Sequence, residues 1–281
     1  MDDILSSLIE RTWKHYNRFK SINISRKDIF NNTNGYDLYP DKWALIPNSS
    51  IPILWFGDIK AYFNSPIKII SAALNPSNME FKEKGDSNYS FVRFKRGLEV
   101  YQKDTLDELD REIFAETLNN YFNDIPYHSW FNSFEKVLNY IDSSYYSNSG
   151  KSNIAIHTDI YTPLATDPTW GNLKNDEIKD RIGNEGFILW QDLIDYLKPD
   201  IILVSINQTV FTKVFGLSPA GADEEYRGKG NSYIRRYEKN NCIVIWGYNC
   251  QGTAFGGMTD EFKKDVFRRM NILERYRKQE E

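Results

Sequence analysis

The chain has 281 residues, a formal net charge of -4 and a pI of about 5.6. Hydrophobic residues make up 41% of the sequence and aromatic residues 15%, which excludes a disordered chain and is enough to bury a sizeable core. The acidic balance argues against a protein that coats nucleic acid by general electrostatics, although a small basic patch around a site is compatible with it.

The cysteine content and the length of the apolar runs narrow the class of protein further. Cys242 and Cys250 are too few for a four-thiolate cluster and form no Cys-x-x-Cys pattern, so we expect free thiols. Asp159 and Asp167 lack clustered histidine partners, so we expect no metal, and no cofactor is expected either. The N-terminus lacks the apolar core of a signal peptide, and no run approaches the roughly 18 apolar residues of a membrane span. The sequence therefore predicts a soluble, cytoplasmic protein without a membrane partner, and leaves its oligomeric state open.

The predicted elements alternate along the chain. An amphipathic helix is expected over residues 3–20, and a short buried element at 50–58 after a polar, Asn-rich link. Buried strands are expected at residues 67–74, 153–162, 200–207 and 241–247. Helices are expected at residues 105–123, 129–141, 185–197 and 259–278, the first of them opening on a Thr105/Glu108 capping box. Residues 83–97 and the Gly-rich 216–232 are expected to be loops, the second a mobile one.

This alternation predicts an α/β fold, a three-layer α/β/α sandwich around a central, mostly parallel four-stranded sheet. We expect a single domain over residues 1–281, with an N-terminal helical extension at about 1–45. In such sheets ligand sites lie beyond the carboxyl ends of the strands. The strand ends are therefore the places to look for a site.

The strand at 67–74 stops abruptly at Asn75-Pro76-Ser77. Taken alone, this tripeptide predicts a turn, because Pro fixes φ and Ser or Asn can cap a following helix. Polar residues also close two other predicted strands, at His157-Thr158-Asp159 and at Asn249-Cys250-Gln251. Three polar strand ends at one edge of a sheet favour a functional site.

A hydrophobic strand followed by Asn-Pro-Ser resembles the first motif of the uracil-DNA glycosylase superfamily. The mismatch-specific and single-strand-selective branches have a Gly-x-Asn-Pro-Gly-like corner, whereas this chain has Ala73 two residues before Asn75. A bacterial branch of the superfamily is more fully similar over about residues 50–260. Four blocks carry that resemblance: WFGD at 55–58, LNPSNMEF at 74–81, AIHTDIYTPLATDPTW at 155–170 and the looser NCQGTAFGG at 249–257.

The resemblance implies a glycosylase-like fold and a metal-free DNA N-glycosylase that flips a damaged or modified base into its site. Asn75 would hold the attacking water, while Pro76 and Ser77 would fix the corner and contact the DNA backbone. Phe81 is the expected stacking face for the base, with Tyr89 and Phe91 as rivals. For each aromatic residue the alternative is ordinary core packing.

His157 and Asp159 stand where the superfamily often places a base-reading Asn. An ionised Asp159 only accepts hydrogen bonds, which suits the amino group of a cytosine-type base better than uracil. The alternatives are that Asp159 caps a turn or orients His157, and that His157 is a satisfied core histidine. The late loop lacks the family's leaving-group histidine; Asn249 would donate to the base carbonyl and Gln251 would enter the gap in the duplex.

Arg93, Lys95 and Arg96 alternate with aromatic residues and are expected to follow a DNA backbone, single- or double-stranded; the alternative is a solvated face. Two other functions stay open: a catalytically inactive module that binds nucleic acid or a nucleotide with the same fold, and a hydrolase of small nucleosides. The identity of the base, and whether the role is repair or defence against phages with modified cytosines, are also open.

Overall fold

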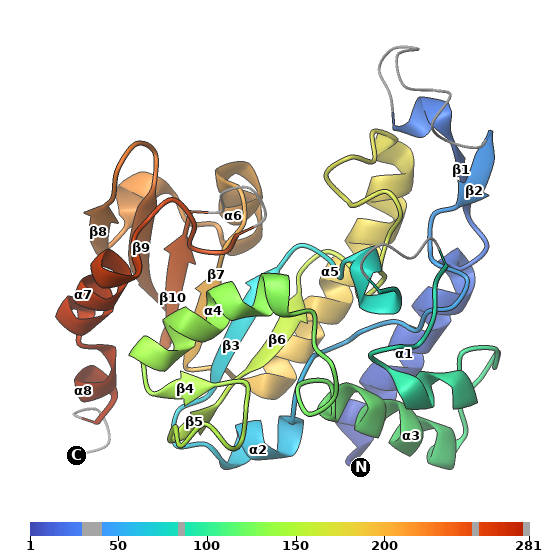
Figure 1. Ribbon diagram of the computed structural model, residues 1–281, viewed down its shortest axis with the longest axis horizontal. Helices are drawn as coiled ribbons and strands as arrows, with labels where there is room; N and C mark the ends of the chain where they lie inside the picture. Colours follow the sequence, from blue (N-terminus) through green and yellow to red (C-terminus); the bar gives the residue numbers. More distant parts are fainter. Residues whose placement is uncertain (30–40, 84–87, 249–252, 278–281) are drawn as a thin grey trace. The chain divides into compact units, whose positions relative to one another are not determined.

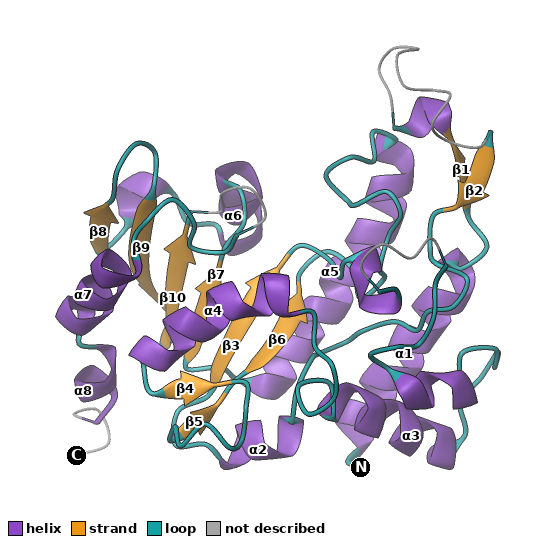
Figure 2. Cartoon of the chain, in the orientation of Figure 1, coloured by secondary structure: helices purple, strands orange, loops and turns teal. Residues whose placement is uncertain are grey.

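The computed structural model describes residues 1–29, 41–83, 88–248 and 253–277 (Figures 1 and 2). The chain divides into two compact units, each assembled from three separate stretches of sequence. The first unit comprises residues 1–57, 74–126 and 158–197, and the second comprises residues 58–73, 127–157 and 198–281. No described helix is both long enough and apolar enough to cross a membrane.

A mixed six-stranded sheet, in the order β6-β3-β7-β10-β9-β8, organises the second unit. Its strands are β3 (Ile69–Ala73), β6 (Ile156–Asp159), β7 (Ile201–Val204), β8 (Glu224–Arg227), β9 (Tyr233–Lys239) and β10 (Cys242–Gly247). β3, β7 and β10 are parallel, and β9 and β8 continue the sheet in antiparallel pairing. The predicted α/β class is confirmed, but the prediction of a mostly parallel sheet of four strands is wrong.

The missing strands are the β8–β9 hairpin, which lies partly in the predicted mobile loop at 216–232. β9 is buried on both faces over residues 234–237, and each face carries one arginine, Arg235 or Arg236, beside the buried Ile234 and Tyr237. The Arg235 Nε donates to Glu225, and the Arg236 Nη1 lies 3.3 Å from the Glu224 Oε1 on the facing strand. The Arg235 guanidinium also lies 4.0 Å from the centroid of the Tyr233 ring. Cross-strand charge pairs and cation–π contact thus stabilise a hairpin that apolar periodicity does not reveal.

The other elements of the second unit lie around this sheet. They are α2 (Ile59–Asn64), α4 (His128–Tyr140), β4 (Ser143–Ser144), β5 (Asn153–Ile154), α6 (Gln208–Phe215), η5 (Pro219–Gly221), α7 (Asp260–Met270) and α8 (Ile272–Arg277). α4 packs against α7, with the Tyr140 and Phe267 rings 6.2 Å apart. The predicted helix at 259–278 is divided at Asn271, whose φ of 47° ends α7.

The first unit is mainly helical. It contains α1 (Asp3–Phe19), β1 (Asn23–Ser25), η1 (Arg26–Asp28), β2 (Lys42–Ala44), η3 (Asn78–Phe81), η4 (Lys95–Glu99), α3 (Glu108–Asn119) and α5 (Asp176–Leu197). α1 packs against α5 and α3, so the predicted N-terminal helix belongs to the core of this unit. The buried stretch at 50–58 forms no strand of its own: Phe56 makes a single β-bridge, and the Ile53 N–H donates to the Pro163 carbonyl at 2.7 Å.

The predicted capping box of α3 is displaced by two residues. Asp107 is the N-cap: its Oδ1 accepts from the Asp110 backbone N–H at 2.9 Å, and its own N–H donates to the Asp110 Oδ2 at 3.2 Å. This reciprocal pair satisfies two backbone donors and leaves Thr105 and Glu108 outside the box. The helix therefore begins at the Asp107/Asp110 pair, which the sequence analysis did not predict.

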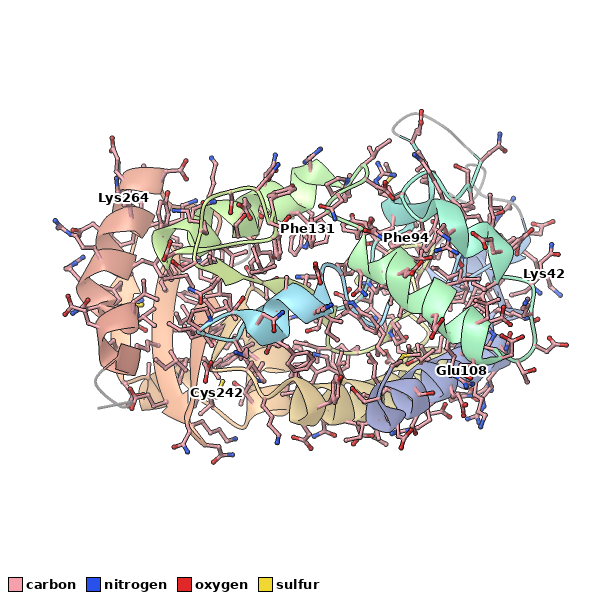
Figure 3. The ribbon with its side chains drawn as sticks, turned by 90° about the horizontal axis from the view of Figure 1, so that it is seen from below. Lys42, Phe94, Glu108, Phe131, Cys242 and Lys264 are labelled. Atoms are coloured by element: carbon pink, nitrogen blue, oxygen red, sulfur yellow. The ribbon has the colours of Figure 1, made fainter. Side chains whose placement is uncertain are left out.

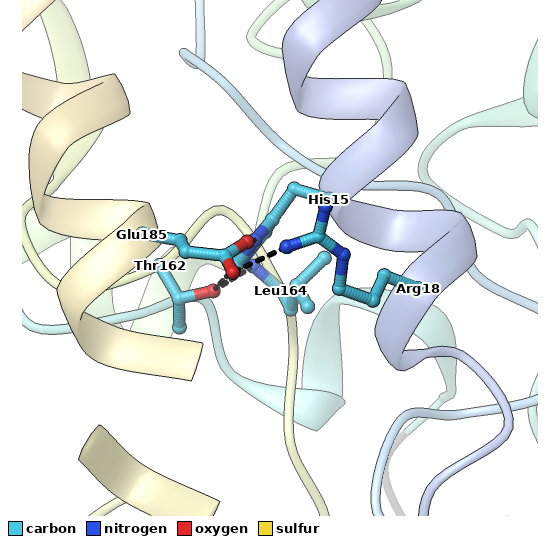
Figure 4. A network of polar contacts seen from close by, with 5 residues as sticks. All are labelled: His15, Arg18, Thr162, Leu164 and Glu185. Atoms are coloured by element: carbon cyan, nitrogen blue, oxygen red, sulfur yellow. Dashed lines mark hydrogen bonds and ion pairs between the residues drawn. The ribbon is translucent and has the colours of Figure 1, made fainter. Parts of the chain in front are cut away.

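A buried histidine on α1 contacts α5 and the chain after β6 within the first unit (Figure 4). The ring of His15 on α1 places Nδ1 3.3 Å from the Glu185 Oε2 on α5 and Nε2 3.3 Å from the Thr162 Oγ1. The same hydroxyl accepts from the Leu164 N–H at 3.2 Å, and Arg18 also pairs with Glu185. Burial lowers the pKa of His15, although Glu185 acts in the opposite direction. The histidine is therefore held neutral.

We expect this histidine to make the protein less stable in mild acid. Its folded pKa lies below the unfolded value of about 6.5, so its contribution is complete above that pH and is lost as the pH falls below it. Urea unfolding between pH 7.5 and 5 should show this loss, and His15→Gln should flatten the slope. The exposed His128 provides the control, because His128→Gln should leave the slope unchanged. An equal slope in wild type and His15→Gln would contradict the prediction.

Candidate functional site

The Asn75-Pro76-Ser77 corner follows β3 and opens the short helix η3. The Ser77 Oγ accepts from the Met79 N–H at 3.1 Å, and the Ser77 carbonyl accepts from the Glu80 N–H at 3.0 Å. Ser77 is thus a helix cap, as the turn interpretation of this tripeptide expects. Pro76 is buried beneath it.

Within the first unit, the chain after β3 lies beside the chain after β6. The Tyr161 N–H donates to the Leu74 carbonyl at 2.9 Å, and Ser77 forms a parallel bridge with Thr166. Two of the three predicted polar strand ends are therefore brought together. The third, with Asn249 and Gln251, lies outside the described residues.

The carboxamide of Asn75 is fixed between these two segments. Its Nδ2 lies 3.0 Å from the Pro76 carbonyl, 3.2 Å from the Thr166 Oγ1 and 3.4 Å from the Leu164 carbonyl. Because backbone carbonyls only accept, these contacts determine which end of the amide is the nitrogen. No described residue donates a hydrogen bond to its Oδ1. The corner therefore presents a half-buried amide oxygen of fixed direction.

A buried carboxyl, which the sequence interpretation missed, lies on η3 directly after this corner. The Glu80 side chain is 2% exposed, and its Oε2 accepts a hydrogen bond from the Tyr121 hydroxyl at 2.5 Å. Burial raises the pKa of Glu80 to about 8; Tyr121 and Arg93 oppose that rise, and Asp159 adds to it. In the sequence, the sign of this buried carboxyl is an acidic residue placed between the apolar Met79 and Phe81 within the LNPSNMEF block.

The predicted base-reading residues Asp159 and His157 differ in their surroundings. Both lie in β6, and Asp159 is its last residue, within the strand predicted at 153–162. Asp159 is buried in the first unit, and its negative charge contributes to the raised pKa of Glu80. His157 is buried in the second unit, where its Nδ1 lies 2.7 Å from the Ser71 Oγ and its ring packs edge-on against Phe131 (labelled in Figure 3) at 5.1 Å. That placement favours the interpretation of His157 as a satisfied core histidine.

Phe81, the expected stacking face, has a side chain that is 0% exposed. Its ring stacks on Phe94 (labelled in Figure 3) with centroids 5.3 Å apart, and Phe94 stacks in turn on Tyr121 at 5.2 Å. Phe91, one of its rivals, is also buried and meets the Phe81 ring edge-on at 6.0 Å. These contacts favour core packing for both phenylalanines.

Tyr89, the other rival, is only half-buried. Its hydroxyl donates to Asp167, and the Asn78 Nδ2 lies 3.5 Å from the same oxygen. Burial and the neighbouring Asp167 carboxylate raise the pKa of Tyr89. The Lys82 Nζ lies 4.9 Å from the centroid of the Tyr89 ring. Of the three aromatic candidates, Tyr89 thus has the most accessible ring.

The three cations predicted to follow DNA have different environments. Arg93 is 8% exposed, and its Nη1 donates to the carbonyls of Met79 at 3.0 Å and Lys82 at 2.9 Å. Arg96 is exposed and pairs with Glu99 and Glu116. Lys95 is exposed. Arg93 therefore supports the backbone of η3, and of the three only Lys95 and Arg96 face solvent.

Two further residues of the site are Leu164 and Thr166, which belong to the AIHTDIYTPLATDPTW block and to which the sequence motifs assign no role. Their oxygens hold the Asn75 amide, which only the pairing of residues 74–77 with 161–166 makes visible. No protein-family model matches the chain, and no curated protein sequence matches it.

Proposed function

We propose that the protein is a DNA glycosylase, with a uracil-DNA glycosylase-like three-layer sandwich fold, that hydrolyses the N-glycosidic bond of a flipped damaged or modified base. The observation that carries the proposal is the Asn75 amide, whose nitrogen is engaged by three acceptors and whose oxygen remains able to accept from a water. The half-buried Tyr89 is the ring on which a base would stack.

Glycosidic cleavage develops positive charge on the sugar and negative charge on the departing base. An amide oxygen orients a water but is a weak base, so the rate would depend on positioning and on electrostatic stabilisation of the separating charges. The buried Asp159 carboxylate would accept from an amino group on the base. The proposed substrate is therefore a modified cytosine rather than uracil.

Hydrolysis of free nucleosides is a second candidate, favoured by one observation. Arg93 is buried and engaged with backbone carbonyls, and Arg96 is paired with two glutamates. A small substrate needs no row of cations along a sugar-phosphate backbone. Assays with free nucleosides separate this candidate from the first.

We expect the purified protein to form abasic sites in DNA. The substrates are single- and double-stranded oligonucleotides that carry uracil, hypoxanthine, hydroxymethylcytosine or glucosylated hydroxymethylcytosine, and alkali converts each abasic site into a strand break. The Asp159→Asn variant, assayed on the same panel, should change the preferred base toward uracil, because an amide both donates and accepts.

Intact strands on every substrate would refute the glycosylase and leave a nucleic-acid or nucleotide-binding module. Turnover of free nucleosides alone would establish the second candidate. An unchanged base preference in Asp159→Asn would remove that residue from base recognition without affecting the glycosylase assignment.

A further inference from the structure

Glu80 carries a carboxyl group in the protein interior, where ionisation of a carboxyl is energetically unfavourable, and the reaction proposed above does not use it. It is on η3, the helix that the Asn75-Pro76-Ser77 corner opens, and its side chain is turned into the protein. The Arg93 guanidinium holds the carbonyls of Met79 and Lys82, on either side of Glu80 in sequence. The position of the Glu80 carboxyl is thereby fixed by the backbone around it as well as by Tyr121.

Three groups from three other segments influence the ionisation of the Glu80 carboxyl. Tyr121, which follows α3, donates a hydrogen bond at 2.5 Å, and Arg93, from the loop before η4, supplies a positive charge. Asp159, at the end of β6, supplies a negative charge that opposes ionisation of Glu80. Burial exceeds the two stabilising influences, so the pKa of about 8 leaves Glu80 protonated at neutral pH.

We propose that Glu80 is a positioning residue that holds a proton in the buried interior of the first unit, which also contains Asp159, so that the two carboxyls carry a single negative charge and that charge stays on Asp159. The inference rests on the proposed function, because it takes Asp159 to be the group that reads the base. Two carboxyls that interact in a buried place do not both ionise readily. Ionisation of Glu80 would add a second buried anion that repels the Asp159 carboxylate and would disturb the acceptor that the base meets.

The first test is the pH profile of base excision, with each protein normalised to its own rate at pH 7. The wild-type rate is expected to fall about tenfold between pH 7 and 9, because one pH unit above a pKa leaves about a tenth of the protonated form. Glu80→Gln keeps an acceptor for Tyr121 but cannot ionise, so its rate should fall less than about twofold over the same range. Glu80→Ala removes the acceptor and leaves space, and its profile should also lack the alkaline decline.

An alkaline decline in Glu80→Gln equal to that of the wild type would overturn the proposal. So would a wild-type profile that is flat to pH 9. A purely structural Glu80 would lower the rate of the variants at every pH and leave the shape of their profiles unchanged.

The second test observes the proton directly and needs no substrate. The infrared carbonyl stretch of a neutral carboxylic acid should be present in the wild type at pH 7, absent from Glu80→Gln, and lost from the wild type by pH 9. Absence of the band at pH 7 overturns the proposal whatever the activity. A band without cleavage of any substrate refutes the glycosylase and the positioning role together, and leaves the protonated Glu80 as a structural group.

Discussion

Replacing Asn75 with alanine is expected to lower the base-excision rate by about a hundredfold to a thousandfold, the range seen when one fixed polar group is removed from a transition-state site. The substitution removes the oxygen that would orient the water, and it releases three acceptors: the Pro76 carbonyl in the corner and two on the neighbouring segment, at Leu164 and Thr166. Single-turnover excision on the preferred substrate measures the loss.

The matched control is Asn120→Ala, which makes the same substitution at an exposed position where the amide donates to the Glu116 carbonyl of its own helix. Its rate should equal that of the wild type. Circular dichroism must show that Asn75→Ala is folded, because loss of its hydrogen bonds is expected to cost about 1–3 kcal/mol of stability. A folded Asn75→Ala with the wild-type rate would remove Asn75 from the reaction.

Replacing Gly186 with alanine is expected to destabilise the protein by about 2–4 kcal/mol, at the upper end for overpacking a core. Gly186 lies on α5, where a Cβ would stand 2.1 Å from the Tyr161 carbonyl oxygen and 2.7 Å from the Thr162 Cα. Both neighbours are backbone atoms, so relief requires that the helix or the segment move. Urea unfolding at pH 7.5 measures the change.

Gly171→Ala is the control in the same unit, because a Cβ there meets no atom within 4 Å apart from its own chain neighbours, and its backbone is not left-handed. Its free energy of unfolding should stay within about 0.5 kcal/mol of the wild-type value. Equal stability of the two variants would mean that α5 does not pack against residues 161–162 as closely as the structure shows.

The parallel part of the sheet was predictable because its strands are continuous apolar runs. Residues 69–73, 201–204 and 242–247 are almost entirely buried, and burial on both faces is what produces such runs. The β8–β9 hairpin was not predictable by that signal, since Arg235 and Arg236 occupy its buried positions and are neutralised by glutamates on the facing strand. Only the pairing reveals that those charges are satisfied.

The candidate site was predictable in its backbone and only in part in its side chains. The polar corner at Asn75 and the buried Asp159 follow from polar residues at strand ends, which parallel sheets gather at one edge. Sequence alone does not distinguish a base-stacking ring from a core ring, and the packing of Phe81 is set by contacts with Phe94 that lie outside its own motif. The role of Thr166 likewise depends on which segment lies beside the corner.

The fixed amide of Asn75 has an entropic consequence. A free asparagine side chain on a surface samples several rotamers, and immobilising such a side chain on binding costs about 0.5–1.5 kcal/mol. Here Pro76, Leu164 and Thr166 have already selected one rotamer during folding. A water or ligand that approaches the Oδ1 thus meets a preorganised acceptor, and the ordering of this side chain subtracts nothing from its affinity.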